Sequence, residues 1–232
     1  MSSAAASAEP WAERAADRSP ALQRSRARQM EQATLIVDAA RRLIAERGGR
    51  FTTQELVKEA GVALQTFYRI FSGKDQLLLA VFENLIAESC AEYEAAAADL
   101  PDPVSRLRYY VTIPIAGLGN PDSGIGPRFV TAEHWRLHEL FPDEMIHATN
   151  HFTDLVTRQL ELATAEGLLA SSDPQRDAWF VTKLVMAVFH HYAFADTEPD
   201  TRAIADDLWG FCATALGAGP DRTPGVTGIR HD

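Results

Sequence analysis

Hydrophobic side chains recur at helical spacing along most of the chain. In the first clear case, Ile36, Leu43 and Ile44 fall on one face of a helix that starts near residue 29. No stretch of useful length alternates between apolar and polar residues, so the pattern predicts an all-α protein of about nine helices. The remaining helices are expected over 53–59, in a short segment ending near residue 71, and over 74–99, 103–118, 127–140, 143–168, 174–195 and 200–217.

Local signals mark several helix ends. Gly48 is placed to cap the end of the first helix. Thr52 precedes Glu55 by three residues, which is the spacing of a capping box and predicts a helix start. Asp173 followed by Pro174 is a second start signal, because it pairs an N-cap residue with proline at the first helical position.

Two terminal segments lack such patterns. Residues 1–28 are rich in Ala, Ser, Arg and Pro without apolar periodicity, so we expect a mostly disordered N-terminal arm. Residues 218–232 are rich in Gly and Pro and predict a flexible tail.

Composition excludes several classes of protein. Hydrophobic residues make up 46% of the 232, which is ordinary for a globular chain. Cys90 and Cys212 are far apart and form no metal or disulfide motif, so we expect reduced thiols. The longest aliphatic run, at 184–189, is too short to span a bilayer, and the N-terminus does not resemble a secretory signal. The sequence therefore predicts a cytoplasmic protein without membrane association.

Charge is divided unevenly along the chain. The net charge is −10, yet residues 1–75 contain 12 Lys and Arg against 9 Asp and Glu, while residues 76–232 contain 10 against 23. A basic N-terminal third on an acidic remainder favours a small DNA-contacting head, although a difference of this size also arises by chance.

The segment around Gly61 has the organisation of a helix-turn-helix. Leu56 and Phe67, with neighbouring apolar residues, can lock two short helices together across the glycine turn. Gln can bond adenine edges, Thr can touch phosphate or a thymine methyl, and Tyr and Arg can reach phosphates. The alternative is an ordinary helical hairpin. The outward-facing residues are Ala63, Leu64, Gln65, Thr66, Tyr68 and Arg69.

The same segment resembles the N-terminal domain of the tetracycline-repressor (TetR) family of bacterial transcription regulators. The motif runs from about residue 33 to residue 82. The matching features are Thr52 and Thr53, Ala60-Gly61-Val62, Tyr68 and Phe71, Lys74-Asp75 and Leu77. The resemblance implies a DNA-binding domain over 29–75 and an effector-binding and dimerisation domain over 76–217. It implies DNA contacts by the outward-facing residues above and by Thr52, Thr53 and Lys74, with Lys74 holding a phosphate at the start of the next helix.

Two positions depart from the family pattern. Ala63 stands where the family often has a serine that caps the reading helix, and the loss of such a cap costs about 1 kcal/mol. Leu64 offers only apolar contact, for example to a thymine methyl. Upstream, Arg24, Arg26 and Arg28 form either a minor-groove arm or a solvated tail.

The last two predicted helices carry many apolar residues. The helix over 174–195 is apolar on nearly all sides, so it must be buried on several sides. The resemblance implies a four-helix bundle between two copies of the chain, and a homodimer binds a near-palindromic duplex. A monomeric core helix remains the alternative. The interface residues expected are Trp179, Leu184, Val185, Val188, Phe189, Ile204, Leu208 and Phe211.

The middle of the chain is rich in aromatic residues and histidines. A cavity lined by apolar groups and a few polar ones suits a small, largely apolar effector, and core packing is the alternative for each residue. The predicted pocket residues are Phe82, Ile86, Tyr93, Tyr109, Tyr110, Phe129, His134, Trp135, His138, Met145, His147, His151 and Phe152.

Two histidine pairs have the i, i+4 spacing of metal ligands, at 134 and 138 and at 147 and 151. Neither pair has the glutamate of the His-Glu-x-x-His motif, and no cysteine is near, so we expect neither a metal nor a cofactor. The hypothesis is a homodimeric DNA-binding regulator, a repressor released by a small molecule, and not an enzyme. The alternatives are an all-α metal-dependent enzyme and an effector-independent regulator or activator.

Overall fold

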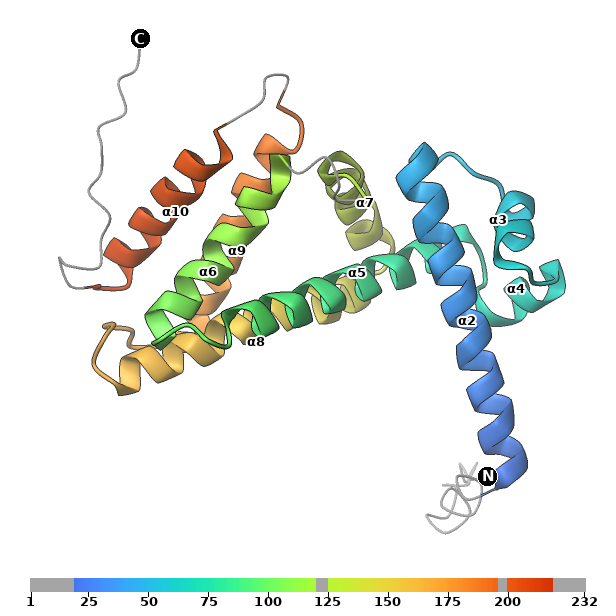
Figure 1. Ribbon diagram of the computed structural model, residues 1–232, viewed down its shortest axis with the longest axis horizontal. Coiled ribbons are helices and arrows are strands. Elements are labelled where there is room, and N and C mark those ends of the chain that lie inside the picture. The colour runs from blue at the N-terminus through green and yellow to red at the C-terminus, as the bar shows by residue number, and fades with distance from the viewer. Residues whose placement is uncertain (1–18, 120–124, 196–199, 219–232) are drawn as a thin grey trace, which may run out of the picture. The chain divides into compact units, whose positions relative to one another are not determined.

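The computed structural model describes residues 19–119, 125–195 and 200–218. Within these ranges the chain forms nine α-helices and one short 3-10 helix, without strands, which confirms the all-α prediction (Figure 1). The helices are α2 (Pro20–Arg47), α3 (Thr53–Ala60), α4 (Leu64–Ile70), α5 (Lys74–Ala97), α6 (Pro103–Ala116), η1 (Gly117–Gly119), α7 (Pro127–Leu140), α8 (Pro142–Ala165), α9 (Pro174–Tyr192) and α10 (Thr201–Ala215). The chain divides into two compact units, Met1–Leu77 and Leu78–Asp232.

The N-terminal unit is built on α2, against which α3 and α4 both pack. Ile36, Ala39, Ala40, Leu43 and Ile44 are buried along one face of α2, as their spacing predicted. Leu56 of α3 and Phe67 of α4 are almost fully buried and complete this small core.

The predicted capping signals act as expected in this unit. Thr52 Oγ1 accepts from the backbone N–H of Glu55, and the Glu55 carboxylate accepts from the backbone N–H of Thr52 at 2.8 Å. These two bonds hold the start of α3. At the end of α3, Gly61 adopts a left-handed backbone conformation with a φ of 66°, in which any other residue would be strained. The chain turns at this glycine into α4.

The start of the first helix was predicted too late. Helix α2 begins at Pro20, directly after Ser19, and its turns over 20–30 are exposed. These residues are mostly Ala, Leu, Gln, Arg and Met, which favour helix without needing an apolar face, and adding turns to an existing helix requires no new nucleus. The expected disorder up to residue 28 is therefore wrong for residues 20–28. Residues 1–18 of that arm, and most of the predicted C-terminal tail, lie outside the described residues.

The C-terminal unit is a helical bundle centred on α6. Helix α6 packs against α8, α9 and α10, and α8 packs against α7 and α9 (Figure 1). The core is formed by large apolar side chains from α6, α8, α9 and α10. They include Leu107, Val111, Ile115, Val156, Leu160, Val185, Leu208 and Trp209. A second cluster joins α5, α6 and α8 through Cys90, Ala97, Tyr110 and Leu155. None of the helices described is long and apolar enough to cross a lipid bilayer.

Candidate DNA-reading helix and ligand cavity

Helix α4 is anchored by aromatic packing beneath it. Phe67 is fully buried, with its ring centroid 5.8 Å from that of Phe71 and 5.1 Å from that of Tyr68. Tyr68 is itself 56% exposed and Leu64 40%, so both side chains project from the unit. The short helix thus has one buried anchor and an open outer face.

The outer face of α4 is polar apart from Leu64. Gln65 and Arg69 are exposed, and Thr66 is half-buried. The N-cap position is Ala63, whose side chain makes no capping hydrogen bond, as expected for alanine. The first backbone N–H groups of the helix therefore have no side-chain cap from that residue.

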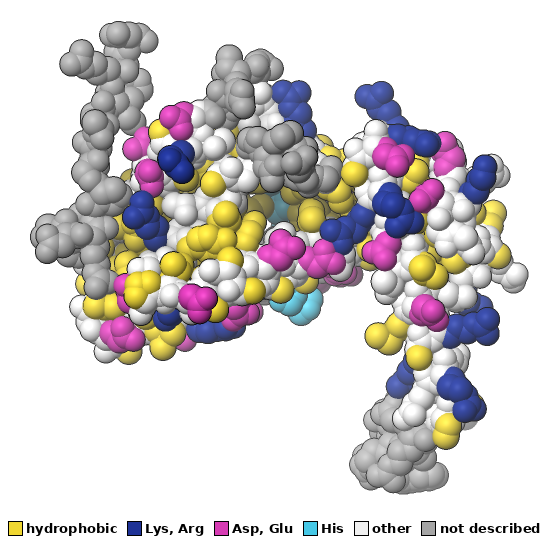
Figure 2. All heavy atoms as spheres, viewed as in Figure 1, with side chains coloured by type: hydrophobic (Ala, Val, Ile, Leu, Met, Phe, Trp, Pro, Cys, Tyr) yellow, Lys and Arg dark blue, Asp and Glu magenta, His cyan; other side chains and the backbone are white. Residues whose placement is uncertain are grey.

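A groove of about 500 Å³ runs between α4 and the exposed part of α2. Arg69 Nη2 donates to Gln32 Oε1 at 2.8 Å across it. Its lining residues are Ser25, Arg28, Gln29, Gln32, Thr66 and Arg69. Two guanidinium groups and two hydroxyls in one groove make an environment that suits an anion. Arg24 and Arg26 lie on the same exposed turns but outside this lining. Figure 2 shows basic side chains along α2, and all of them are arginines.

Lys74, predicted to hold a phosphate, is engaged by other groups within the N-terminal unit. Its Nζ donates to the carbonyl oxygens of Gly49 at 2.6 Å and Phe51 at 2.8 Å, and lies 4.2 Å from the centroid of the Phe51 ring. The ammonium group therefore ties the start of α5 to the loop after α2.

Thr52 is also engaged locally. Its hydroxyl donates to the Glu55 carboxylate at 2.9 Å in addition to accepting the capping bond. The backbone N–H and the hydroxyl of Thr52 hold the pKa of Glu55 below its usual range, and the charges of Arg47 and Lys74 add to this effect. Thr53, the first residue of α3, is half-buried.

The C-terminal unit contains a cavity of about 1080 Å³. Several predicted pocket residues line it, namely Phe82, Ile86, Tyr93, His134, Trp135, His138 and Phe152. The others do not. Tyr110 and Met145 are almost fully buried in the core. Outside the lining there are also Tyr109, Phe129, His147 and His151.

Sequence reasoning missed the contribution of α9 to this cavity. Val185, Met186, Phe189 and His190 all line it. The signal was available, since a helix that is apolar on nearly all sides must face more than one neighbour. The prediction assigned those faces to a second copy of the chain, whereas one of them closes a cavity within the same unit.

The histidines of the cavity form an aromatic cluster. The ring of His134 lies 4.8 Å from that of His190 and 6.2 Å from that of His138, measured between centroids. Burial, together with the charges of His190, His138 and Lys183, lowers the pKa of His134 to about 4, and burial lowers the pKa of His190. Among the described residues, no group of three or more His, Cys, Asp or Glu side chains is arranged to hold a metal ion.

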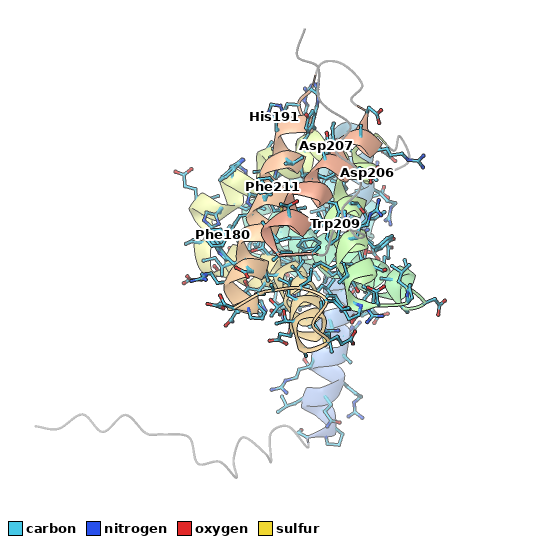
Figure 3. All side chains as sticks on the ribbon, turned by 90° about the vertical axis from the view of Figure 1, so that its left-hand side faces the viewer. Phe180, His191, Asp206, Asp207, Trp209 and Phe211 are labelled. Atoms are coloured by element: carbon cyan, nitrogen blue, oxygen red, sulfur yellow. The ribbon has the colours of Figure 1, made fainter. Side chains whose placement is uncertain are left out.

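The predicted dimer residues fall into three groups by their burial. Val185 and Leu208 are buried in the core of the unit, so their assignment to an interface is wrong. Leu184, Val188, Phe189 and Ile204 are partly buried against that core. By contrast, Trp179 is 50% exposed and Phe211 67%, and the unassigned neighbour Phe180 is 57% exposed. Figure 3 looks toward α9 and α10 and labels Phe180 and Phe211.

An all-helical chain with a helix-turn-helix in its N-terminal unit belongs to the helix-turn-helix class of proteins. Residues 36–81 match the family model for bacterial regulatory proteins of the tetR family. Over 79 residues the chain is 32% identical to the HTH-type transcriptional regulator BetI of Brucella anthropi, a match that covers 34% of this chain and 41% of BetI, so it spans less than half of BetI's length.

Solved structures extend the likeness to both units. RolR, in complex with resorcinol, has a TM-score of 0.65 at 18% identity, covering 84% of this chain and 92% of RolR. The transcriptional regulator FadR from Bacillus subtilis, in complex with stearoyl-CoA, has a TM-score of 0.63 at 16% identity, covering 79% and 98%. At these identities the likeness shows a shared fold. Residues 36–81 thus match the tetR family model, and the rest of the described chain shares its fold with the regulators RolR and FadR.

Proposed function

We propose that the chain is a DNA-binding transcriptional regulator that responds to a small molecule and acts in the cytoplasm. The observation that carries the DNA-binding part is the open face of α4, which is anchored by Phe67 and lies inside the segment that matches the tetR family model. A short helix held from beneath and polar outside suits insertion into a major groove.

Gln65 is the residue best suited to read bases. It is exposed near the start of α4, and a glutamine amide can donate to and accept from an adenine edge at once. Tyr68 and Arg69, further along the same face, are suited to phosphates, which position the helix without reading sequence.

The groove between α2 and α4 supplies a second phosphate contact in this proposal. Arg28 and Arg69 both line it, and Thr66 contributes a hydroxyl beside them. Arg28 thus takes the role that the sequence assigned to an arm of three arginines, and it does so from a helix. Arg26 lies outside the lining.

Dimerisation is proposed through the exposed aromatic face of α9 and α10. Trp179, Phe180 and Phe211 are at least half exposed, and large apolar side chains exposed on these two helices favour an interface. Two copies related by a two-fold axis would present two reading helices to a near-palindromic duplex.

Effector binding is proposed at the cavity of the C-terminal unit. A concave, mostly apolar site with a few polar groups is typical of small-molecule sites, and RolR and FadR were each solved with a small molecule bound. Helix α5 starts at Lys74, and its residues Phe82, Ile86 and Tyr93 line the cavity. We therefore propose that the ligand acts on DNA affinity through α5 and releases the regulator, which then functions as a repressor.

The test uses purified full-length protein and a library of random duplexes from which bound sequences are selected. The wild type is expected to enrich one near-palindromic motif. Gln65→Ala should weaken binding to that motif by about 1–3 kcal/mol and relax it at defined base pairs. Glu161→Gln, a charge change at an exposed position of α8 outside the cavity lining, serves as the control. Failure of the wild type to enrich any motif would contradict the proposal.

A further inference from the structure

The ligand cavity contains a polar centre made by two histidines. His134 of α7 and His190 of α9 have ring centroids 4.8 Å apart. Aromatic rings surround the pair, since Phe82 lies 5.8 Å from His134, Trp135 lies 5.3 Å from His134 and 5.7 Å from His190, and Phe189 lies 5.7 Å from His190. This arrangement places hydrogen-bonding groups beside aromatic rings in a mostly apolar lining, which also includes Glu92 and Lys183.

Each histidine has one buried nitrogen that lacks a partner in the described part of the chain. His190 Nδ1 lies 2.9 Å from Thr131 Oγ1, while the other ring nitrogen, Nε2, is buried without a hydrogen bond. The Nδ1 atom of His134 is likewise buried without a hydrogen bond. Thr182, which is 3% exposed and lines the same cavity, has an unpartnered hydroxyl two turns away on α9. Buried polar atoms almost always have partners, so these atoms point to a polar group supplied by a ligand.

The two imidazoles are neutral at physiological pH, because burial lowers the pKa of both. A neutral imidazole has one N–H donor and one acceptor nitrogen, and either tautomer is available to it. A hydroxyl donates one hydrogen bond and can accept two, so it satisfies both open nitrogens whenever at least one of them carries the proton. An ether oxygen and a carboxylate can only accept, so each satisfies both open nitrogens only when both nitrogens carry protons, although Lys183 on the same lining could pair with a carboxylate.

We propose that the ligand of this cavity is an uncharged, largely apolar alcohol or phenol whose hydroxyl inserts between His134 and His190. This inference rests on the proposed function, in which the cavity is the effector site. Both nitrogens are shielded from solvent, so the oxygen reaches them by separating the rings. The remainder of the molecule packs against apolar lining residues, which include Leu85, Ile113, Ile125, Val130, Met186 and Phe194.

The experiment titrates full-length protein with two sets of probes by calorimetry. One set has a flat skeleton and comprises 2-naphthol, its methyl ether and 2-naphthoate. The other has a long skeleton and comprises 1-dodecanol, its methyl ether and dodecanoate. At least one alcohol or phenol is expected to bind about tenfold or more tightly than its ether and its carboxylate, because a site built for a hydroxyl rejects analogues that lack it. Tighter binding of both carboxylates, equal binding within each set, or no saturable binding by any probe would overturn the inference.

Variants locate the hydroxyl. His190→Phe and His134→Phe keep an aromatic ring and remove the nitrogens, so each should abolish the preference for the hydroxyl over the ether while the ether still binds. His147→Phe is the matched control, since His147 lies on α8 outside the cavity, and its preference should equal that of the wild type. An unchanged preference in both cavity variants would overturn the inference even if the wild type prefers the hydroxyl. The titrations of the wild type with the probes test the inference even if a variant fails to fold.

Failure of this inference is separable from failure of the proposed function. Calorimetry is performed without DNA, and the duplex selection is performed without ligand. Selective hydroxyl binding with no enriched DNA motif would defeat the proposed regulator and leave the ligand class standing. An enriched DNA motif together with tighter binding of the carboxylates would support the proposed regulator and defeat the inferred ligand class.

Discussion

A substitution of Lys74 can distinguish a structural role of this side chain in the N-terminal unit from a role in binding DNA. Replacing it by methionine keeps the length of the side chain and removes its charge. The variant leaves the carbonyl oxygens of Gly49 and Phe51 without their donor and removes the cation from the Phe51 ring. We expect Lys74→Met to destabilise the unit.

The size of the effect follows from these contacts. A hydrogen bond to a charged group contributes roughly 1.5–3 kcal/mol, and a cation over an aromatic ring about 0.5–1 kcal/mol near the surface. Lys74 is half-buried and the contributions are not additive, so a loss of about 2–4 kcal/mol is expected. Lys74→Arg, which keeps the charge with a different shape, should lose less.

The assay is urea denaturation followed by circular dichroism, combined with hydrogen exchange of peptides covering residues 49–77. Lys74→Met should lower the free energy of unfolding and speed exchange in those peptides. At a temperature where the variant is folded, the salt dependence of its DNA affinity should match that of the wild type. Wild-type stability together with a weaker salt dependence would refute this reasoning and restore Lys74 as a phosphate ligand.

The other predictions concern a cap, the dimer, pH and the groove. Thr52→Ala should cost about 1 kcal/mol of unfolding free energy in urea titrations, and an unchanged midpoint would contradict the capping role. Phe211→Glu should give folded monomers in light scattering, while Val185→Glu should unfold the C-terminal unit because it buries a charge; a monomeric wild type would defeat the dimer. The pKa of His134 is 6.5 in the unfolded chain and about 4 in the folded protein, so between these pH values the unfolded state binds more protons than the folded state. Stability should therefore rise from pH 4 to pH 6.5, and His134→Phe should flatten that rise in thermal scans. Arg28→Ala should lower the salt slope of DNA binding by about one per protomer and Arg26→Ala should not, and equal slopes for both would contradict the groove contact.

Helix order was predictable because it depends on local chemistry. The Thr52–Glu55 box, Gly61 and the Asp173-Pro174 start each act within a few residues, so the sequence alone indicates them. The first turns of α2 were missed because they have helix-forming side chains but no buried face, and periodicity detects only buried faces.

Side-chain roles that depend on tertiary packing were less predictable. Lys74 bonds carbonyl groups more than twenty residues away, which spacing cannot reveal. Val185 is apolar and lies on a helix apolar nearly all round, so its sequence does not say whether it meets its own protomer or a partner. His134 was predicted to line the pocket and does line the cavity, but its pairing with His190 joins two helices distant in sequence.

The central claim is that α4 reads DNA, and the most direct measurement is the selection of duplexes by wild-type protein and by Gln65→Ala in parallel. The account predicts that the wild type enriches two half-sites about one turn of DNA apart, and that the variant loses preference at matching base pairs in both halves. An identical motif for the two proteins would contradict the account, as would the absence of any motif for the folded wild type.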